Sequence, residues 1–144
     1  MRILVLNGVN LDELQRRPAE LYGGLSLSEL ETRIYEWASE RECTVRCRQT
    51  NHEGEFVDWC HEGLDWADGV VVNPGAWGHY SWAIRDALDL FASPVVEVHL
   101  SNVDEREEWR RFSVLGDVVA KRVIGMGPDG YREALDFLVG SAAE

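Results

Sequence analysis

Residues 69–81 read G-V-V-V-N-P-G-A-W-G-H-Y-S and join an apolar run to a group of polar side chains. The run Gly69–Val72 is short, apolar and rich in Val, which predicts a buried strand. Pro and Gly alone would turn the chain where this strand ends. The Asn, His, Tyr and Ser that flank them indicate that something binds at this end of the strand.

Short runs rich in Val and Ile recur along the chain and predict five strands. They are Arg2–Leu6, Thr44–Gln49, Gly69–Asn73, Pro94–His99 and Val118–Ile124. Apolar residues at helical spacing predict helices at Ser26–Arg41, Glu53–Ala67, Ser81–Phe91 and Gly130–Val139. Ser26 and Glu29 fit a capping box at the start of the first helix. This alternation predicts an α/β fold, a doubly wound parallel sheet with helices on both faces. Five strands in this length favour the flavodoxin-like order 2-1-3-4-5.

The composition predicts one globular domain over residues 1–144. About 45% of the residues are apolar and six are Trp, which is enough for a single core. No apolar run approaches the roughly 20 residues of a membrane span, and the first residues turn polar too soon for a signal peptide. We therefore expect a cytoplasmic protein. The three Cys, at positions 43, 47 and 60, form no CxxC or Cys/His cluster, so we expect no structural zinc.

The charge pattern favours a small anionic ligand. The net charge of −12 disfavours nucleic acid and anionic membranes, which require basic patches. Any single arginine is best interpreted as a solubilising surface charge. As a set in an acidic chain, the arginines beside the unusual segments indicate an anionic small molecule. These arginines are Arg16, Arg17, Arg85, Arg106, Arg110 and Arg111.

Polar side chains follow the first four predicted strands. Ligands of open parallel sheets bind outside the carboxyl ends of the strands. The segments at these ends all carry Asn, and they are Asn7–Asn10, Asn51–Glu55, Asn73–His79 and His99–Asn102. Asn side chains can hold hydroxyls, a carbonyl or a water, while His79 and His99 can transfer protons near neutral pH. We interpret His52 and His61, in or beside a helix, as structural or solvated.

A polar loop over residues 12–24 follows the first strand and is long enough to form a mobile lid over the site. It contains Arg17 and Tyr22. A tyrosine beside an arginine can act as a base, because the cation favours the phenolate. From these residues alone, an ordinary half-buried loop aromatic is the better interpretation of Tyr22.

No other catalytic pattern in the chain is complete. There is no HExxH sequence and no pair of His on one helix face. A Ser-His-Asp triad with Ser101 is possible, yet no G-x-S-x-G elbow exists. A literal G-x-G-x-x-G occurs at 125–130, but only residues 131–144 follow it, too few for a dinucleotide-binding unit. A tight strand-to-helix turn is the better interpretation.

Six longer motifs occur in order along the chain. They are R-I-L-V-L-N-G-x-N-L (2–11), R-R-x-x-x-x-Y-G (16–23), Q-x-N-H-E-G-E (49–55), N-P-G-A-x-x-H (73–79), R-D-A-L (85–88) and E-V-H-L-S-N (97–102). R-E-x-x-R (106–110) and G-x-G-x-x-G-Y (125–131) match as well. From residue 2 to about 139 the chain resembles type II 3-dehydroquinate dehydratase. The resemblance implies a flavodoxin-like fold, no cofactor or metal, and a homo-oligomer, a dodecamer of trimers. It implies anti elimination of water from 3-dehydroquinate through an enolate, giving 3-dehydroshikimate in the shikimate pathway.

The resemblance also implies a catalytic set. Tyr22 would be the general base on the carbon beside the ketone, with Arg17 stabilising its phenolate. Asn10 would hold a water that stabilises the enolate oxygen. His99 would be the general acid to the leaving hydroxyl, oriented by Glu97.

A second implied set would bind the substrate. Asn73, His79 and Arg110 would contact ring hydroxyls, and Ser101 with the neighbouring amide of Leu100 would hold the carboxylate. Arg106 resembles the lid-facing arginine of the family, and Asp86 resembles its contact from the neighbouring subunit.

Several residues depart from the family pattern, although the implied catalytic set is complete. Val9 stands where the family usually has Pro, and Asp12, Glu13 and Gln15 replace the usual lead into the arginine pair. The segment Trp77–Trp82 brings aromatic bulk beside a site histidine. The other departures are Asp104, Glu105 and Phe112.

Three hypotheses follow from these residues. The complete catalytic set favours a 3-dehydroquinate dehydratase with a divergent periphery. The changes at Trp77, Gly78, Tyr80 and Trp82 favour a bulkier or amino-substituted relative of that substrate, although large aromatics there would equally pack a trimer interface. A flavodoxin-like binding or signalling domain fits poorly, because Asn7–Asn10 is not a Ser/Thr-rich phosphate loop.

Overall fold

The structure, a computed structural model, describes residues 1–144 and contains a five-stranded parallel sheet in the order β2-β1-β3-β4-β5. The strands are β1 Arg2–Asn7, β2 Thr44–Gln49, β3 Gly69–Asn73, β4 Val95–His99 and β5 Lys121–Ile124. The predicted fold class and strand order are therefore confirmed. Since every neighbouring pair is parallel, the carboxyl ends of the strands meet at one edge of the sheet.

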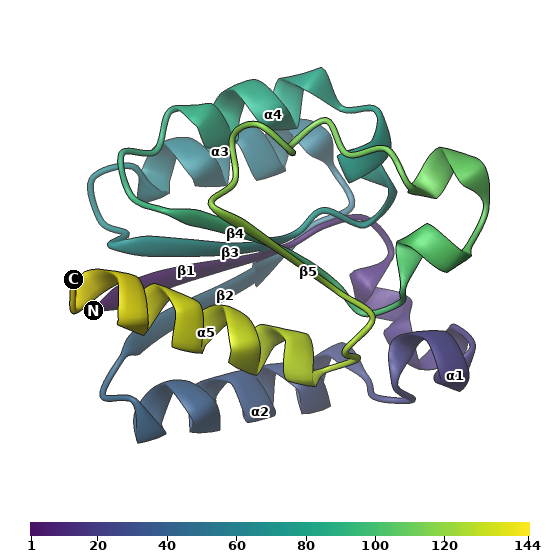
Figure 1. The fold of residues 1–144 in the computed structure, drawn as a ribbon, viewed down its shortest axis with the longest axis horizontal. Coiled ribbons are helices and arrows are strands. Elements are labelled where there is room, and N and C mark those ends of the chain that lie inside the picture. Colours follow the sequence, from purple (N-terminus) through teal and green to yellow (C-terminus); the bar gives the residue numbers. More distant parts are fainter.

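Four long helices cover the sheet, two on each face (Figure 1). Helices α2 (Leu27–Glu40) and α5 (Asp129–Ala142) lie on one face, and α3 (Glu53–Gly63) and α4 (Trp82–Asp89) lie on the other. The central strands are buried on both faces, so they read as nearly continuous apolar runs. Alternate residues of β1 serve the two cores, with Ile3 packed on the α2/α5 side and Leu4 on the α3/α4 side.

Short helices occupy the edge where the strands end. They are η1 Leu11–Arg16, α1 Ala19–Tyr22, η2 Gly75–His79, η3 Val103–Glu105 and η4 Glu108–Arg110. The segment 12–24, which we expected to be an irregular loop, thus contains most of η1 and all of α1. Leu11 and Leu14 of η1 are buried, so apolar contacts hold the start of this segment against the body of the protein, whereas no residue of α1 is buried.

Local signals explain where most helices begin. The predicted capping box is confirmed, because the Ser26 hydroxyl accepts from the Glu29 amide at 3.1 Å and the Glu29 carboxylate accepts from the Ser26 amide. Ser81 precedes α4 as its N-cap and accepts from the Ile84 amide at 3.3 Å. The predicted start of that helix at Ser81 was therefore one residue early.

Strand β5 and helix α3 were predicted several residues too long, and α4 ends at Asp89 and not at Phe91. Strand β5 begins at Lys121, since Val118 and Val119 lie before it as half-buried residues packed on the α3/α4 core. Helix α3 ends at Gly63 and not at Ala67. A Cβ at position 63 would lie 2.6 Å from Leu4 Cδ2, so the glycine lets the end of this helix approach the sheet closely. In both cases half-buried apolar residues pack on the α3/α4 core without being part of the regular element.

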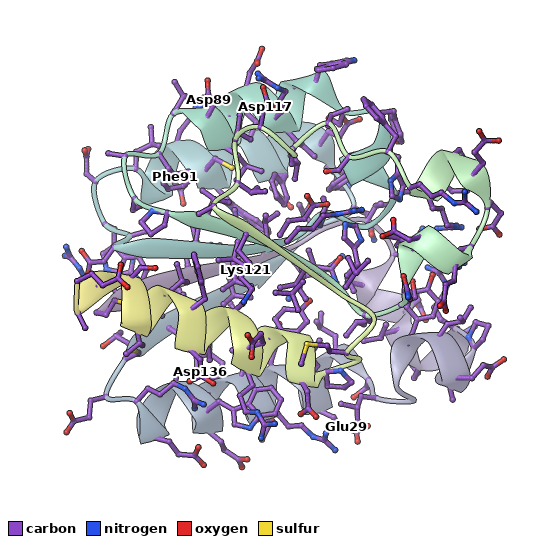
Figure 2. All side chains as sticks on the ribbon, viewed as in Figure 1. Glu29, Asp89, Phe91, Asp117, Lys121 and Asp136 are labelled. Carbon is purple, nitrogen blue, oxygen red and sulfur yellow. The ribbon has the colours of Figure 1, made fainter.

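The outer surface carries the acidic excess of the chain. Figure 2 places Glu29, Asp89 and Asp136 at the periphery, where all three are exposed. None of the helices combines the length and the hydrophobicity that a membrane span requires. No three His, Cys, Asp or Glu side chains are grouped so that they could hold a metal ion.

Candidate active site

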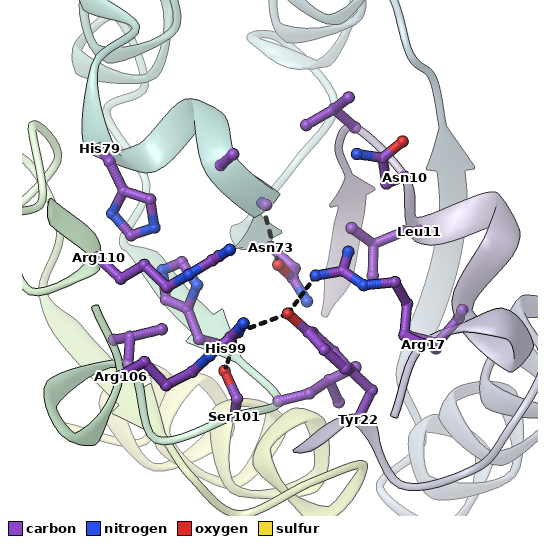
Figure 3. A pocket seen from close by; sticks show the side chains of 16 residues that line it. Asn10, Leu11, Arg17, Tyr22, Asn73, His79, His99, Ser101, Arg106 and Arg110 are labelled. Atoms are coloured by element: carbon purple, nitrogen blue, oxygen red, sulfur yellow. Dashed lines mark hydrogen bonds between the residues drawn. The ribbon is translucent and has the colours of Figure 1, made fainter. Parts of the chain in front are cut away.

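A pocket opens at the carboxyl ends of the strands, beside the short helices (Figure 3). It gathers ten of the twelve residues that the sequence singles out as site residues. They are Asn10, Arg17, Tyr22, Asn73, His79, His99, Leu100, Ser101, Arg106 and Arg110. Glu97 lies behind the pocket wall in contact with His99. Asp86 is the exception, because its side chain is exposed on α4 and pairs with Arg85.

Asn10 enters the pocket from the turn after β1, in a left-handed backbone conformation with φ of 69°. This conformation is uncommon for residues other than glycine, although Asn tolerates it best. The backbone N–H of Asn10 donates to Asn51 Oδ1 at 2.8 Å, and Asn51 Nδ2 donates to Asp12 at 2.9 Å. The asparagine after β2 therefore holds the turn after β1 in place.

Tyr22 reaches the pocket from the end of α1 and accepts hydrogen bonds from two arginines. Arg17 donates to the phenolic oxygen and stacks over the ring, with its guanidinium carbon 4.2 Å from the ring centroid. Arg106 donates to the same oxygen at 2.5 Å and to Ser101 Oγ at 3.2 Å. N–H groups of two arginines thus converge on one phenolic oxygen. Tyr22 is therefore a residue of the pocket and not an ordinary loop aromatic.

His99 ends β4 and is held from behind by a buried carboxylate. Its Nε2 lies 2.6 Å from Glu97 Oε2, and a carboxylate can only accept in such a bond, so Nε2 carries a hydrogen. The side chain of Glu97 is fully buried, and Ser113 Oγ donates to its other oxygen at 2.8 Å. Burial raises the pKa of Glu97, but the bonds from His99 and Ser113 and the charges of His99 and Arg122 outweigh burial and lower the pKa overall. Glu97 is therefore a carboxylate at neutral pH, and Nδ1 is the ring nitrogen of His99 that remains for a ligand.

His79 lies beside His99, with the two rings stacked at a centroid distance of 5.8 Å. Its Nδ1 is 2.8 Å from the carbonyl oxygen of Phe112, so Nδ1 carries the hydrogen. Burial lowers the pKa of His79, and the charges of His99 and Arg110 lower it further. The hydrogen bond to Phe112 raises this pKa, but it does not outweigh the other effects. His79 is neutral at physiological pH, which leaves Nε2 as a hydrogen-bond acceptor for a ligand hydroxyl.

Asn73, at the end of β3, is oriented by buried partners. Its Nδ2 donates to the hydroxyl of Tyr131 at 3.0 Å, and its Oδ1 accepts from the Gly75 amide at 3.2 Å. The Tyr131 hydroxyl in turn donates to Asn7 Oδ1 at 2.6 Å. Burial raises the pKa of Tyr131, so this hydroxyl stays protonated. One N–H of Asn73 remains for a ligand.

Residues 1–139 match the profile of the family described as Dehydroquinase class II. The chain belongs to this family. It is 46% identical over 133 residues to a protein of Halalkalibacterium halodurans named 3-dehydroquinate dehydratase, and the match covers 92% of each chain. It is similar to the crystal structure of type II dehydroquinase from Butyrivibrio crossotus, with a TM-score of 0.93, 44% identity and coverage of 96% and 97% of the two chains. The corresponding structure from Propionibacterium acnes gives a TM-score of 0.93 at 41% identity, covering 96% of each chain. The predicted family is confirmed.

The aromatic departures from the class II dehydroquinase pattern do not line the pocket. Trp77 is buried and packs edge-on against Phe56, with ring centroids 5.8 Å apart. Tyr80 and Trp82 are 58% and 60% exposed on the outside. The expectation that these residues change the wall of the pocket was therefore wrong. The helical turn of η2 and the start of α4 direct them away from His79.

Of the remaining departures, Val9 lines the pocket of this class II dehydroquinase, whereas Gly78, Asp104, Glu105 and Phe112 do not. Gly78 is buried, and a Cβ there would lie 2.8 Å from the ring of Pro74. Asp104 and Glu105 are exposed on η3, and Phe112 contributes only its backbone carbonyl to His79. Neither the pocket nor the comparisons support the hypothesis of a bulkier or amino-substituted substrate. Membership of this family also rules against the alternative of a signalling domain.

Sequence reasoning missed the supports of the class II dehydroquinase site. Ser113 and Arg122 contact Glu97, and neither belongs to a motif quoted above. Tyr131 was recognised as the end of the G-x-G-x-x-G-Y motif and as part of the apolar stripe of a helix, but neither pattern reveals where its hydroxyl points. The apolar wall of the pocket was also missed, and it consists of Val9, Leu11, Leu14, Ala76 and Val103.

Replacing Tyr131 with Phe is expected to destabilise the protein by about 1–3 kcal/mol, because the buried amides of Asn7 and Asn73 each lose a partner. Thermal and urea unfolding would measure the change. Tyr35→Phe is the matched control, since Tyr35 is 46% exposed and should lose little. Equal effects of the two substitutions would contradict the assigned hydrogen bonds.

Proposed function

We propose that this protein catalyses the elimination of water from 3-dehydroquinate to give 3-dehydroshikimate. The observation that carries the proposal is the pairing of Tyr22, under two arginines, with the His99–Glu97 pair in one pocket. Relatives named 3-dehydroquinate dehydratase match nearly the whole chain, which supports the same substrate here.

The first step is removal of a proton from the carbon beside the ketone. The Tyr22 phenolate takes this proton, and the electron pair moves into the ketone to form an enolate. A water held by Asn10 stabilises the enolate oxygen. Arg17 and Arg106 keep the phenolate available, because both donate to its oxygen.

The second step expels the hydroxyl from the neighbouring ring carbon, on the side of the deprotonated carbon that is away from the ketone. The enolate collapses to a carbon–carbon double bond, and the leaving hydroxyl takes a proton from Nδ1 of His99 and departs as water. Glu97 holds Nε2 of the same ring, so it fixes the ring and stabilises its protonated form. The proton is removed from one face of the ring and the hydroxyl leaves from the opposite face, which is an anti elimination.

Substrate binding uses side chains that still have a free hydrogen-bond donor or acceptor. Asn73, His79 and Arg110 bind the ring hydroxyls. The hydroxyl of Ser101 accepts from Arg106 and is free to donate to the substrate carboxylate, together with the Leu100 amide. The substrate is anionic, which matches the arginines gathered here.

The assembly and the lid belong to the same proposal. We expect residues 12–24 to open for substrate entry and to close Tyr22 over it. We also expect a dodecamer of trimers in the cytoplasm, in which Asp86 of one subunit reaches the neighbouring site. The exposed positions of Asp86, Tyr80 and Trp82 support this expectation, because such side chains are available for contacts between subunits.

The test is turnover of 3-dehydroquinate, followed by the ultraviolet absorbance of the conjugated product. A matched pair of arginine variants sharpens it. Arg17→Gln should lower kcat about 10- to 100-fold, the worth of one charge-assisted hydrogen bond of roughly 1.5–3 kcal/mol. Arg16→Gln should change little, since Arg16 is 79% exposed and pairs only with Glu13. An inactive, folded wild-type protein would reject the proposed function.

A further inference from the structure

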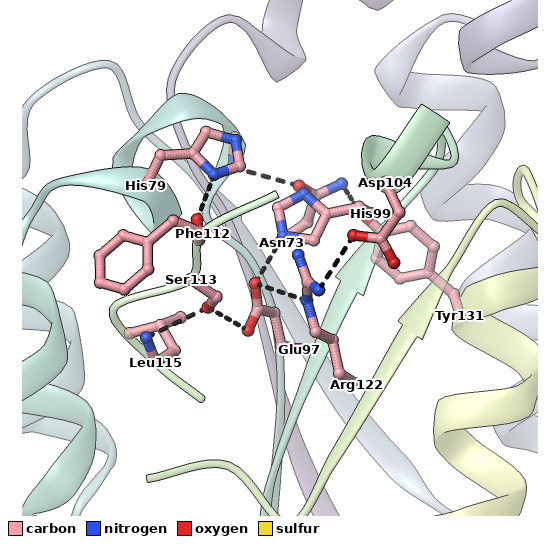
Figure 4. Close-up of polar contacts among 11 residues, drawn as sticks. Asn73, His79, Glu97, His99, Asp104, Phe112, Ser113, Leu115, Arg122 and Tyr131 are labelled. Carbon is pink, nitrogen blue, oxygen red and sulfur yellow. Dashed lines mark hydrogen bonds and ion pairs between the residues drawn. The ribbon is translucent and has the colours of Figure 1, made fainter. Parts of the chain in front are cut away.

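The buried carboxylate of Glu97 has a third neighbour that the proposed mechanism does not use. Parallel pairing of β4 and β5 sets Arg122 directly beside Glu97. Arg122 Nε lies 3.6 Å from Glu97 Oε2, the same oxygen that accepts from His99 (Figure 4). The groups that contact Glu97 are thus His99 from its own strand, Ser113 from the loop before β5, and Arg122 from β5. The ring of His79, from η2, also lies close enough to interact with the charge of Glu97.

Arg122 is held as a cation with few partners. Its Nη1 lies 3.8 Å from Asp104 Oδ1, and Glu97 and Asp104 are the two acidic groups that pair with it. Its Nε and Nη2 are buried without a hydrogen-bond partner. A guanidinium in this state is costly unless its charge is compensated. The compensating charges are Glu97 on the inside and Asp104 on the outside.

This arrangement stabilises the ionised form of Glu97. A fully buried carboxylate tends to take up a proton, and protonated Glu97 would no longer stabilise a protonated His99. Ser113 supplies a neutral hydrogen bond, and His99 is charged only in part of the reaction cycle. Arg122 is therefore the only permanent positive charge in contact with Glu97.

We propose that Arg122 is a positioning residue of the reaction, whose charge keeps Glu97 ionised and so holds His99 ready as the acid. This inference rests on the proposed role of His99. Arg122 does not line the pocket, so it acts through Glu97 and does not contact the substrate.

The sign of the effect follows from the charge. Removing a cation favours the protonated form of every neighbouring group. Activity at low pH is lost when Glu97 takes up a proton, and activity at high pH is lost when the His99 ring gives one up. Both limbs of the pH–rate profile should therefore move to higher pH in a variant without the charge, by about one pH unit.

The experiment compares Arg122→Met with Arg122→Lys. Arg122→Met should move the profile upward and lower kcat several-fold below neutral pH, while KM changes less than about twofold because the pocket is untouched. Arg122→Lys should restore most of the wild-type profile. Arg132→Met is the matched control, since Arg132 is exposed on α5 and pairs only with Asp129. An unchanged profile in Arg122→Met, or a loss of kcat equal at every pH, would overturn the inference.

Two additions keep the test decisive. Asp104→Asn removes the outer anion at an exposed position, so the profile should move slightly to lower pH even if Arg122→Met fails to fold. An absence of any downward shift in that variant would then count against the inference.

The titration of the His99 ring, followed by NMR in the folded protein, should move in the same directions without any substrate. It separates failure of this inference from failure of the proposed function.

Discussion

Replacing Tyr22 with Phe is expected to lower kcat for 3-dehydroquinate by about 10²- to 10⁴-fold, the usual contribution of a general base. The substitution removes one oxygen and keeps the ring that Arg17 covers. No other side chain of the pocket combines a titratable oxygen with two arginine donors. Steady-state kinetics with the ultraviolet assay measures the loss.

The same variant should unfold at nearly the wild-type temperature. Tyr22 is only half-buried, and Arg17 and Arg106 keep access to water when their acceptor is removed. Tyr35→Phe, remote from the pocket, should keep full activity and serves as the matched control. Near wild-type turnover in Tyr22→Phe would remove this residue as the base.

The fold was predictable because its signals are local and repeated. Strands such as Gly69–Asn73 are buried on both faces, so their apolar runs stand out between helices with a spacing of three and four residues. The ends of elements were less predictable. Val118 and Leu64 pack against the core from outside the regular elements, and such packing looks the same in sequence whether or not the residue belongs to a strand or a helix.

The site was predictable in position but only partly in detail. Parallel strands bring their ends together, so Asn10, Asn73 and His99 were expected at one edge. Of the asparagines at the strand ends, Asn7 and Asn51 bind other protein groups, and Asn102 caps η3. An asparagine that binds a substrate and one that holds a turn have the same sequence appearance.

The aromatic residues around His79 show why neighbours in sequence are poor guides to a pocket. Each residue of η2 and α4 points about a third of a turn away from the one before it. A site histidine at position 79 therefore requires that Trp77 and Tyr80 point elsewhere. Contacts such as Ser113 with Glu97 arise across 16 positions of sequence, and nothing local marks them.

Replacing His99 with Asn is expected to stop dehydration while leaving the first proton transfer intact. Hydroxide is a poor leaving group, so loss of the general acid should lower kcat about 10²- to 10⁴-fold. Tyr22 and its two arginines are unchanged in this variant, and the enolate can still form and return to the ketone. In D₂O, the substrate should therefore exchange the proton beside the ketone for deuterium without losing water.

Deuterium exchange, measured by NMR of the recovered substrate, distinguishes the role of His99 from that of Tyr22. His99→Asn should exchange without dehydrating, whereas Tyr22→Phe should do neither. Glu97→Gln should resemble His99→Asn more weakly, because the ring remains but loses its carboxylate partner. If His99→Asn loses exchange and dehydration together, His99 acts in proton abstraction, and the division of labour between the two residues is wrong. If it keeps full dehydration, another group supplies the proton to the leaving hydroxyl.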